Sequence, residues 1–203
     1  MAEPNDSEEA GKYPEGSTAG RPLRRKMREL TLEQALEVIA AAEYATLATC
    51  DREGYPYAVP ISPVLEGDHI YFHATGIPGG RKEDNMLADP NVSLAFVSKS
   101  FTLGSCYSVD YASAIVRGRA KKVETEEEKR HAFDLILKRY APFNSAERNA
   151  IQMKVRGPYA VIWRIEIDHI DGKARAANEW IPGRSPTMLQ DTCTSAWLQG
   201  APK

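Results

Sequence analysis

Three β-forming segments separated by two tight turns constrain the fold of this chain most strongly. They are YATLATC at 44–50, YPYAVPISPVLE at 55–66 and HIYFHA at 69–74, all rich in aromatic and β-branched residues. The intervening DREG and EGD are typical of turns that join antiparallel strands. Three further strands are predicted at 91–98, 108–124 (with a bend near Gly118) and 159–173. Six strands and few helices favour a small antiparallel β-barrel.

Helices are predicted on the flanks of this barrel. Thr31 and Gln34 have the spacing of a capping box, so a helix is expected over 31–43. Further helices are predicted over 82–89, 126–140 and 146–154, the last two capped by Thr125 and Ser145. The predicted fold class is therefore mainly β, a β-barrel with flanking helices.

Prolines interrupt the second predicted strand at positions 56, 60 and 63. Proline has no N–H group to donate to a strand ladder. Part of this segment must therefore be an edge, a bulge or a stretch that faces a ligand.

Composition excludes several classes of protein. The formal net charge of −2 gives no general attraction to nucleic acid. No segment approaches the roughly 20 apolar residues of a membrane span, and no apolar leader is evident, so we expect a cytoplasmic protein. The three cysteines are far apart, which favours reduced thiols over a disulfide framework or a zinc site. We expect tails at 1–22 and 185–203 around one domain at 23–184.

The segment HATGIPGGRKEDN at 73–85 carries the clearest chemical signal. It runs from a strand end through a glycine-rich loop into a helix start. Thr75 contributes a hydroxyl, Arg81 and Lys82 contribute positive charge, and the first N–H groups of a helix favour an anion. These groups predict a cradle for a monophosphate, although the P-loop and Rossmann glycine patterns are absent. His69 and His73 lie roughly 13 Å apart on a strand, so they cannot share a metal ion and no metal site is predicted.

Taken in order, these motifs resemble the pyridoxamine 5'-phosphate oxidase-like superfamily of FMN-binding split barrels. The resemblance covers about 24–175 and lies in the ATLAT, VPIS, YFHAT, RKEDN and YASAIVRGRA segments. Within the superfamily, the chain is most similar to the 5-nitroimidazole antibiotic resistance proteins. The basic substrate residues of true pyridoxamine phosphate oxidases are not evident after residue 175, so vitamin B6 synthesis is not predicted.

The resemblance implies a homodimer of six-stranded antiparallel split barrels with FMN at the subunit interface and a small-molecule substrate. It places the flavin ring beside Val59, Pro60, Ile61 and Ser62. It places the ribityl chain and phosphate beside His73, Ala74, Thr75, Arg81 and Lys82, with Asn85 bracing the loop close to the phosphate. Tyr111 and Ser113 are expected near the cofactor, from either subunit. His73 is also the candidate catalytic residue, which would orient a nitroaromatic substrate or donate a proton to it.

Three alternatives stay open from the sequence. Some members of the superfamily bind haem, for which His73 or His169 would be the axial ligand. Related barrels use a deazaflavin. A third alternative is a flavin-binding module without turnover.

Overall fold

The computed structural model describes residues 21–104 and 107–175. The predicted tails at 1–22 and 185–203 lie outside these residues, apart from positions 21 and 22. Of the three cysteines, only Cys50 is described, as a free thiol. None of the helices in the described part of the chain has both the length and the apolar character of a membrane span.

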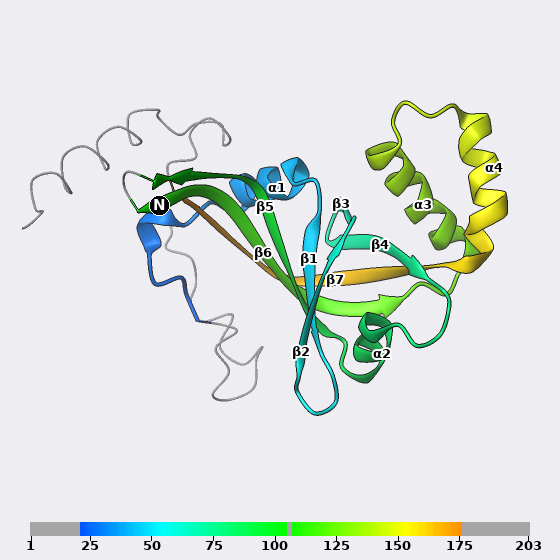
Figure 1. The fold of residues 1–203 in the computed structure, drawn as a ribbon, viewed down its shortest axis with the longest axis horizontal. Helices are drawn as coiled ribbons and strands as arrows, with labels where there is room; N and C mark the ends of the chain where they lie inside the picture. The colour runs from blue at the N-terminus through cyan, green and yellow to red at the C-terminus, as the bar shows by residue number, and fades with distance from the viewer. Residues whose placement is uncertain (1–20, 105–106, 176–203) are drawn as a thin grey trace, which may run out of the picture.

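The strands form a single antiparallel sheet of seven, in the order β2-β1-β5-β6-β7-β4-β3 (Figure 1). Their bounds are β1 Ala45–Cys50, β2 Pro56–Ile61, β3 Val64–Glu66, β4 His69–Thr75, β5 Asn91–Leu103, β6 Ser108–Lys122 and β7 Ala160–Arg175. The two edge strands, β2 and β3, are consecutive in the chain and only Ser62 and Pro63 separate them. Such a short link requires the sheet to curl until its edges approach at one corner, which makes it a split barrel and confirms the predicted fold class.

The number of strands differs from the predicted six. The segment predicted as one strand over 55–66 is two, because β2 pairs with β1 while β3 pairs with β4. Pro63 lies at the break and cannot supply the N–H group that a continuous ladder would need. The fifth strand also continues to Leu103, beyond the predicted end at 98.

Within 21–104 and 107–175, four α-helices flank the sheet: α1 Leu32–Ala41, α2 Arg81–Ala88, α3 Glu126–Tyr140 and α4 Ala146–Arg156, with 3-10 turns η1 Lys26–Arg28 and η3 Gly157–Tyr159. The predicted capping box of Thr31 and Gln34 is present at the start of α1. Helices α1 and α2 contribute Val38, Ile39 and Met86 to the main core, beside Leu47, Phe72 and Trp163 of the sheet.

Helix α3 covers a different face of the sheet. Phe133 and Ile136 pack against Tyr71 of β4 and Ile162 of β7 in a second hydrophobic cluster. Helix α4 contains no buried residue and stands away from the barrel in Figure 1. The barrel therefore has an interior core and one helix-covered outer patch.

Gly118 sits where the register between β6 and β7 shifts, which agrees with the predicted bend. A Cβ atom at this position would lie 2.2 Å from the Glu166 carbonyl oxygen. Only glycine allows the two backbones to approach this closely.

Candidate functional site

No described side chain caps the backbone N–H groups at the start of α2. Its N-cap is Gly80, which provides no side-chain cap. The other three α-helices of the described residues are capped by hydroxyls, because Thr31, Thr125 and Ser145 each accept a hydrogen bond from the backbone three residues on. The first N–H groups of α2 are thus available to an external anion.

Arg81 and Lys82 add two positive charges at this helix start. The guanidinium carbon of Arg81 lies 5.8 Å from the centre of the Tyr57 ring on β2, a cation–π distance. Lys82 is half-buried and lies close enough to His73 to act on its ionisation. The start of α2 therefore lies near both the end of β4 and the edge strand β2.

His73 lies on the outer side of β4, opposite Ile162 of β7. The residue keeps access to solvent, yet partial desolvation of its ring, and secondarily the Lys82 ammonium, lower the pKa of His73 below its usual 6.5. The imidazole is consequently neutral at pH 7. Thr75 also faces outward, and its hydroxyl accepts a hydrogen bond from the Ile77 backbone. Ala74, between them, is buried and can meet a ligand only through its backbone.

Two contacts fix α2 against the barrel. The Asn85 amide nitrogen donates to the Thr49 hydroxyl over 2.9 Å, and the Lys122 ammonium pairs with the Glu83 carboxylate at 3.0 Å. Asn85 is buried, so its amide braces the helix from the interior. These contacts hold Arg81 and Lys82 in place on a rigid element.

Strand β2 offers backbone groups at an open edge. Asp51 donates to the Tyr55 carbonyl, and alternation along the ladder makes Thr49–Tyr57 and Leu47–Val59 the hydrogen-bonded pairs. Pro56, Ala58 and Pro60 then direct their carbonyl groups, and Ala58 its N–H, away from β1. The two prolines thus occupy positions where the missing N–H costs no ladder bond.

The predicted ring neighbours divide between two sides of β2. Ile61 is buried, so it can contact a ligand only through its backbone, and the half-buried Val59 packs against the core. Pro60 is exposed and Ser62 is half-buried. Tyr57, which the sequence analysis did not single out, lies beside Arg81. The alternation in PYAVPI predicts that Tyr57 and Val59 share one side of the strand. It cannot predict the contact of Tyr57 with Arg81, which comes from a helix later in the chain.

Tyr111 and Ser113 do not join the cradle within one chain. Both are half-buried on β6, and the Ser113 hydroxyl donates to the Lys173 carbonyl of β7. Strands β1 and β5 separate β6 from β2, which amounts to about 14 Å at ordinary strand spacing.

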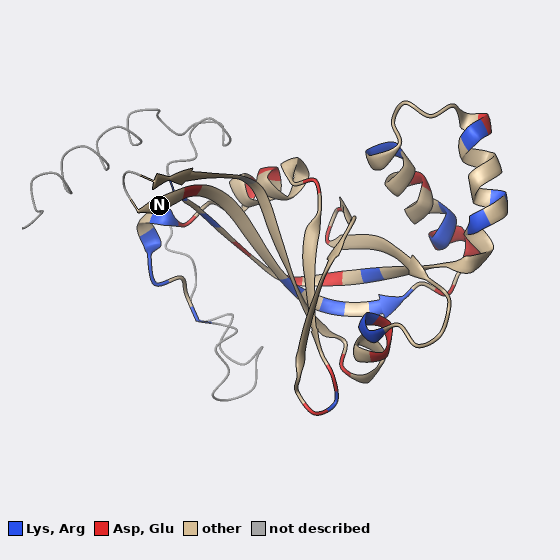
Figure 2. Cartoon of the chain, in the orientation of Figure 1, with Lys and Arg blue, Asp and Glu red and all other residues tan. Residues whose placement is uncertain are grey.

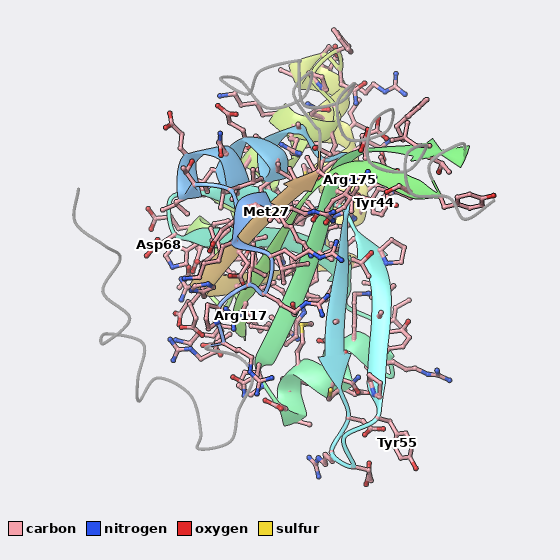
Figure 3. All side chains as sticks on the ribbon, turned by 90° about the vertical axis from the view of Figure 1, so that its left-hand side faces the viewer. Met27, Tyr44, Tyr55, Asp68, Arg117 and Arg175 are labelled. Atoms are coloured by element: carbon pink, nitrogen blue, oxygen red, sulfur yellow. The ribbon has the colours of Figure 1, made fainter. Side chains whose placement is uncertain are left out.

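The outer face of β2 and β1 carries no charged side chain, and no described helix covers it. Strands β1 and β2 carry no charged residue outside the turn that joins them, whereas β6 and β7 carry many (Figure 2). The outward positions of β1, β2 and the neighbouring strands include the exposed or half-buried apolar residues Ala48, Ala58, Pro60, Ala95, Val97 and Ile115, and Thr46, Ser93 and Arg117 lie among them. Tyr55, at the tip of the β1–β2 hairpin, points away from the body of the protein (Figure 3).

The curled sheet and its flanking helices define the class of split-barrel proteins, and sequence comparison narrows that class. Residues 31–174 match the family described as pyridoxamine 5'-phosphate oxidase. The chain belongs to this family, which confirms the resemblance seen in its motifs.

Individual relatives are more distant. A protein of Rhizobium meliloti (strain 1021), itself uncharacterized, is 27% identical over 158 residues, covering 75% of this chain and 98% of the relative. The crystal structure of a proposed 5-nitroimidazole antibiotic resistance protein from Bacteroides thetaiotaomicron VPI-5482 is 27% identical, with a TM-score of 0.59 over 71% of this chain and 85% of that one. An FAD-binding protein from Mesorhizobium loti shares the fold, with a TM-score of 0.53, 22% identity and coverage of 73% and 97%.

Proposed function

We propose that this protein is an FMN-dependent oxidoreductase that acts as a homodimer on small planar compounds, nitroaromatic compounds of the 5-nitroimidazole kind among them. The observation that carries the proposal is the uncapped start of α2, where Lys82 lies near His73 and Arg81 contacts Tyr57. A flavin mononucleotide needs a cationic pocket for its phosphate and a flat slot with backbone donors and acceptors for its ring.

The residues present fit both ends of FMN. Free helix N–H groups, a guanidinium and an ammonium match a phosphate dianion. The open edge of β2 offers the Ala58 N–H and the carbonyls of Pro56 and Pro60, groups that can pair with the polar rim of an isoalloxazine ring. Because Tyr57 contacts Arg81, the two ends belong to one continuous site.

The uncovered sheet face supports the homodimer in this proposal. Small side chains such as Ala48, Ala58 and Ala95 would let a second sheet approach closely, and exposed apolar surface can mark an interaction site. A second copy of the chain is the partner we propose, because Tyr111 and Ser113 of that copy would supply the part of the site that lies too far away within one chain.

His73 takes the role of substrate-orienting residue in this proposal. When bound, the flavin supplies electrons in pairs, from a reduced nicotinamide. Since the pKa of His73 is lowered, the neutral ring dominates at pH 7 and can donate one hydrogen bond to a nitro oxygen. Proton donation by His73 would require its imidazolium form, which is populated only at more acidic pH.

The absorption spectrum of the purified protein tests this proposal. Flavin bands, with FMN identified by mass spectrometry of the released cofactor, support it, and NAD(P)H oxidation with nitroaromatic acceptors then tests turnover. A deazaflavin mass or a haem Soret band would replace FMN as the cofactor. A colourless protein that binds no added FMN would overturn the proposal.

A further inference from the structure

The corner between β2 and β3 is held by a helix that contributes nothing to the phosphate cradle. Ser62 and Pro63 connect the two edge strands and lie outside the sheet ladder. The hydroxyl of Tyr140, the last residue of α3, donates to the Pro63 carbonyl over 2.7 Å. This bond joins residues 77 positions apart and fixes the point at which β2 ends.

Arg139 secures the same end of the β1–β2 ladder from the other side. Its Nη2 donates to the carbonyls of Ala42 and Ala40 at 2.6 and 3.1 Å, groups at the end of α1 that lack helix partners. Three residues after Ala42, β1 begins with Ala45, which pairs with Ile61 of β2. The Arg139 guanidinium also lies 5.4 Å from the centre of the Tyr140 ring and so holds that ring in place.

The other end of α3 is attached to β4. The Tyr71 hydroxyl donates to the Glu128 carboxylate at 3.2 Å, and Arg164 of β7 pairs with the same carboxylate at 2.7 Å. Tyr71 lies two residues before His73 on the same side of β4. Helix α3 therefore spans the distance between the strand that carries His73 and the corner that follows Ile61.

From this geometry we propose that Tyr140, supported by Arg139, is a positioning residue that sets the place of Pro60–Ser62 against the flavin ring. This inference rests on the proposed function. Tyr140 does not contact the phosphate cradle, so it acts on the ring end of the site alone. Loss of its hydrogen bond lets the β2–β3 corner shift, while Arg81 and Lys82 stay where Asn85 and Glu83 hold them.

Comparing riboflavin with FMN tests this inference, because riboflavin has the ring and lacks the phosphate. In Tyr140→Phe, we expect the Kd values of riboflavin and FMN to rise by the same factor, roughly threefold to tenfold for one hydrogen bond. The flavin midpoint potential and absorption maxima should shift as well. In Arg81→Ala/Lys82→Ala, only the Kd of FMN should rise. Tyr55→Phe, at the exposed hairpin tip, is the matched control and should behave as wild type.

The outcomes distinguish failure of the proposed flavin-binding function from failure of the positioning role of Tyr140. If wild type binds neither riboflavin nor FMN, the proposed function fails and this inference fails with it. If wild type binds both, and Tyr140→Phe lowers the melting temperature without changing riboflavin affinity or the potential, the positioning role alone is overturned. Arg139→Lys, which keeps the charge, should shift the potential less than Arg139→Gln, and equal effects would count against the support assigned to Arg139.

Discussion

Helices α2 and α3 both follow a strand of the same sheet, yet their first turns are built in opposite ways. Helix α3 begins with the Thr125 hydroxyl on the Glu128 backbone and three glutamates in its first turn. Helix α2 begins with Gly80 and no side-chain cap, and its first turn places the basic pair Arg81 and Lys82 ahead of Glu83 and Asp84. A side chain satisfies one of the orphan donors of α3, whereas no described side chain caps α2.

This difference separates a helix used for structure from one used for binding. An internal cap adds stability and removes the site at which an anion could bind. In α2 the stability comes from elsewhere, through Met86 in the core and Asn85 on Thr49. Changing the cap or the basic charges should therefore alter anion binding at α2 and stability alone at α3.

The largest effect is expected for removing the basic pair of α2. Arg81→Ala/Lys82→Ala should weaken FMN by about 3–6 kcal/mol if both charge-assisted bonds reach the phosphate, a roughly hundredfold to ten-thousandfold rise in Kd. Isothermal titration calorimetry measures it. The matched control, Arg130→Ala/Lys138→Ala, removes two exposed charges from α3 and should leave the Kd within a factor of two or so. An unchanged FMN Kd in the α2 variant would refute the phosphate assignment.

A cap built into α2 should close its anion site. Gly80 has φ −80°, and a Cβ there meets open space, so substitution brings no strain. Gly80→Asp should raise the FMN Kd roughly thirtyfold, since its carboxylate repels the phosphate by on the order of 2 kcal/mol. Gly80→Ala adds neither cap nor charge and should bind FMN as wild type does. Equal affinities for the Asp and Ala variants would show that the phosphate lies elsewhere.

Removing the cap of α3 should affect stability alone. Thr125→Ala is expected to lower the free energy of unfolding by about 1 kcal/mol, measured by urea denaturation. The FMN Kd, determined on the same preparation, should not change. A cap variant of α3 that loses flavin affinity would contradict the division of roles between the two helices.

The smallest effect concerns the ionisation of His73. Because its pKa is lowered in the folded state, the residue contributes stability that is complete above pH 6.5 and is lost as pH falls toward its folded pKa. Lys82→Ala should move the pKa of His73 back toward its ordinary value, although not fully, because desolvation is the larger cause. NMR titration of the imidazole Cε1–H measures this, and an unchanged pKa would show that the Lys82 charge does not reach the ring.

Most of the local structure could be predicted from the sequence. The caps at Thr31, Thr125 and Ser145 involve partners three residues away, so a short segment contains the whole interaction. The start of β4, the Arg81–Lys82 pair and the alternation in β7 are equally local. The apolar periodicity of strands and helices reports burial directly, which explains why the barrel class was predicted correctly.

Contacts between distant segments depended on the path of the folded chain. The break of 55–66 into two edge strands requires β3 to pair with β4, and the Asn85–Thr49 bond joins residues 36 positions apart. The Tyr57–Arg81 stack and the Tyr140–Pro63 bond arise in the same way. The amino-acid sequence by itself determined which segments became strands, which helices were capped and where positive charge was concentrated. Only the tertiary structure decided which of these segments became neighbours, because pairing partners are selected by burial and closure of the whole sheet and not by the local chain.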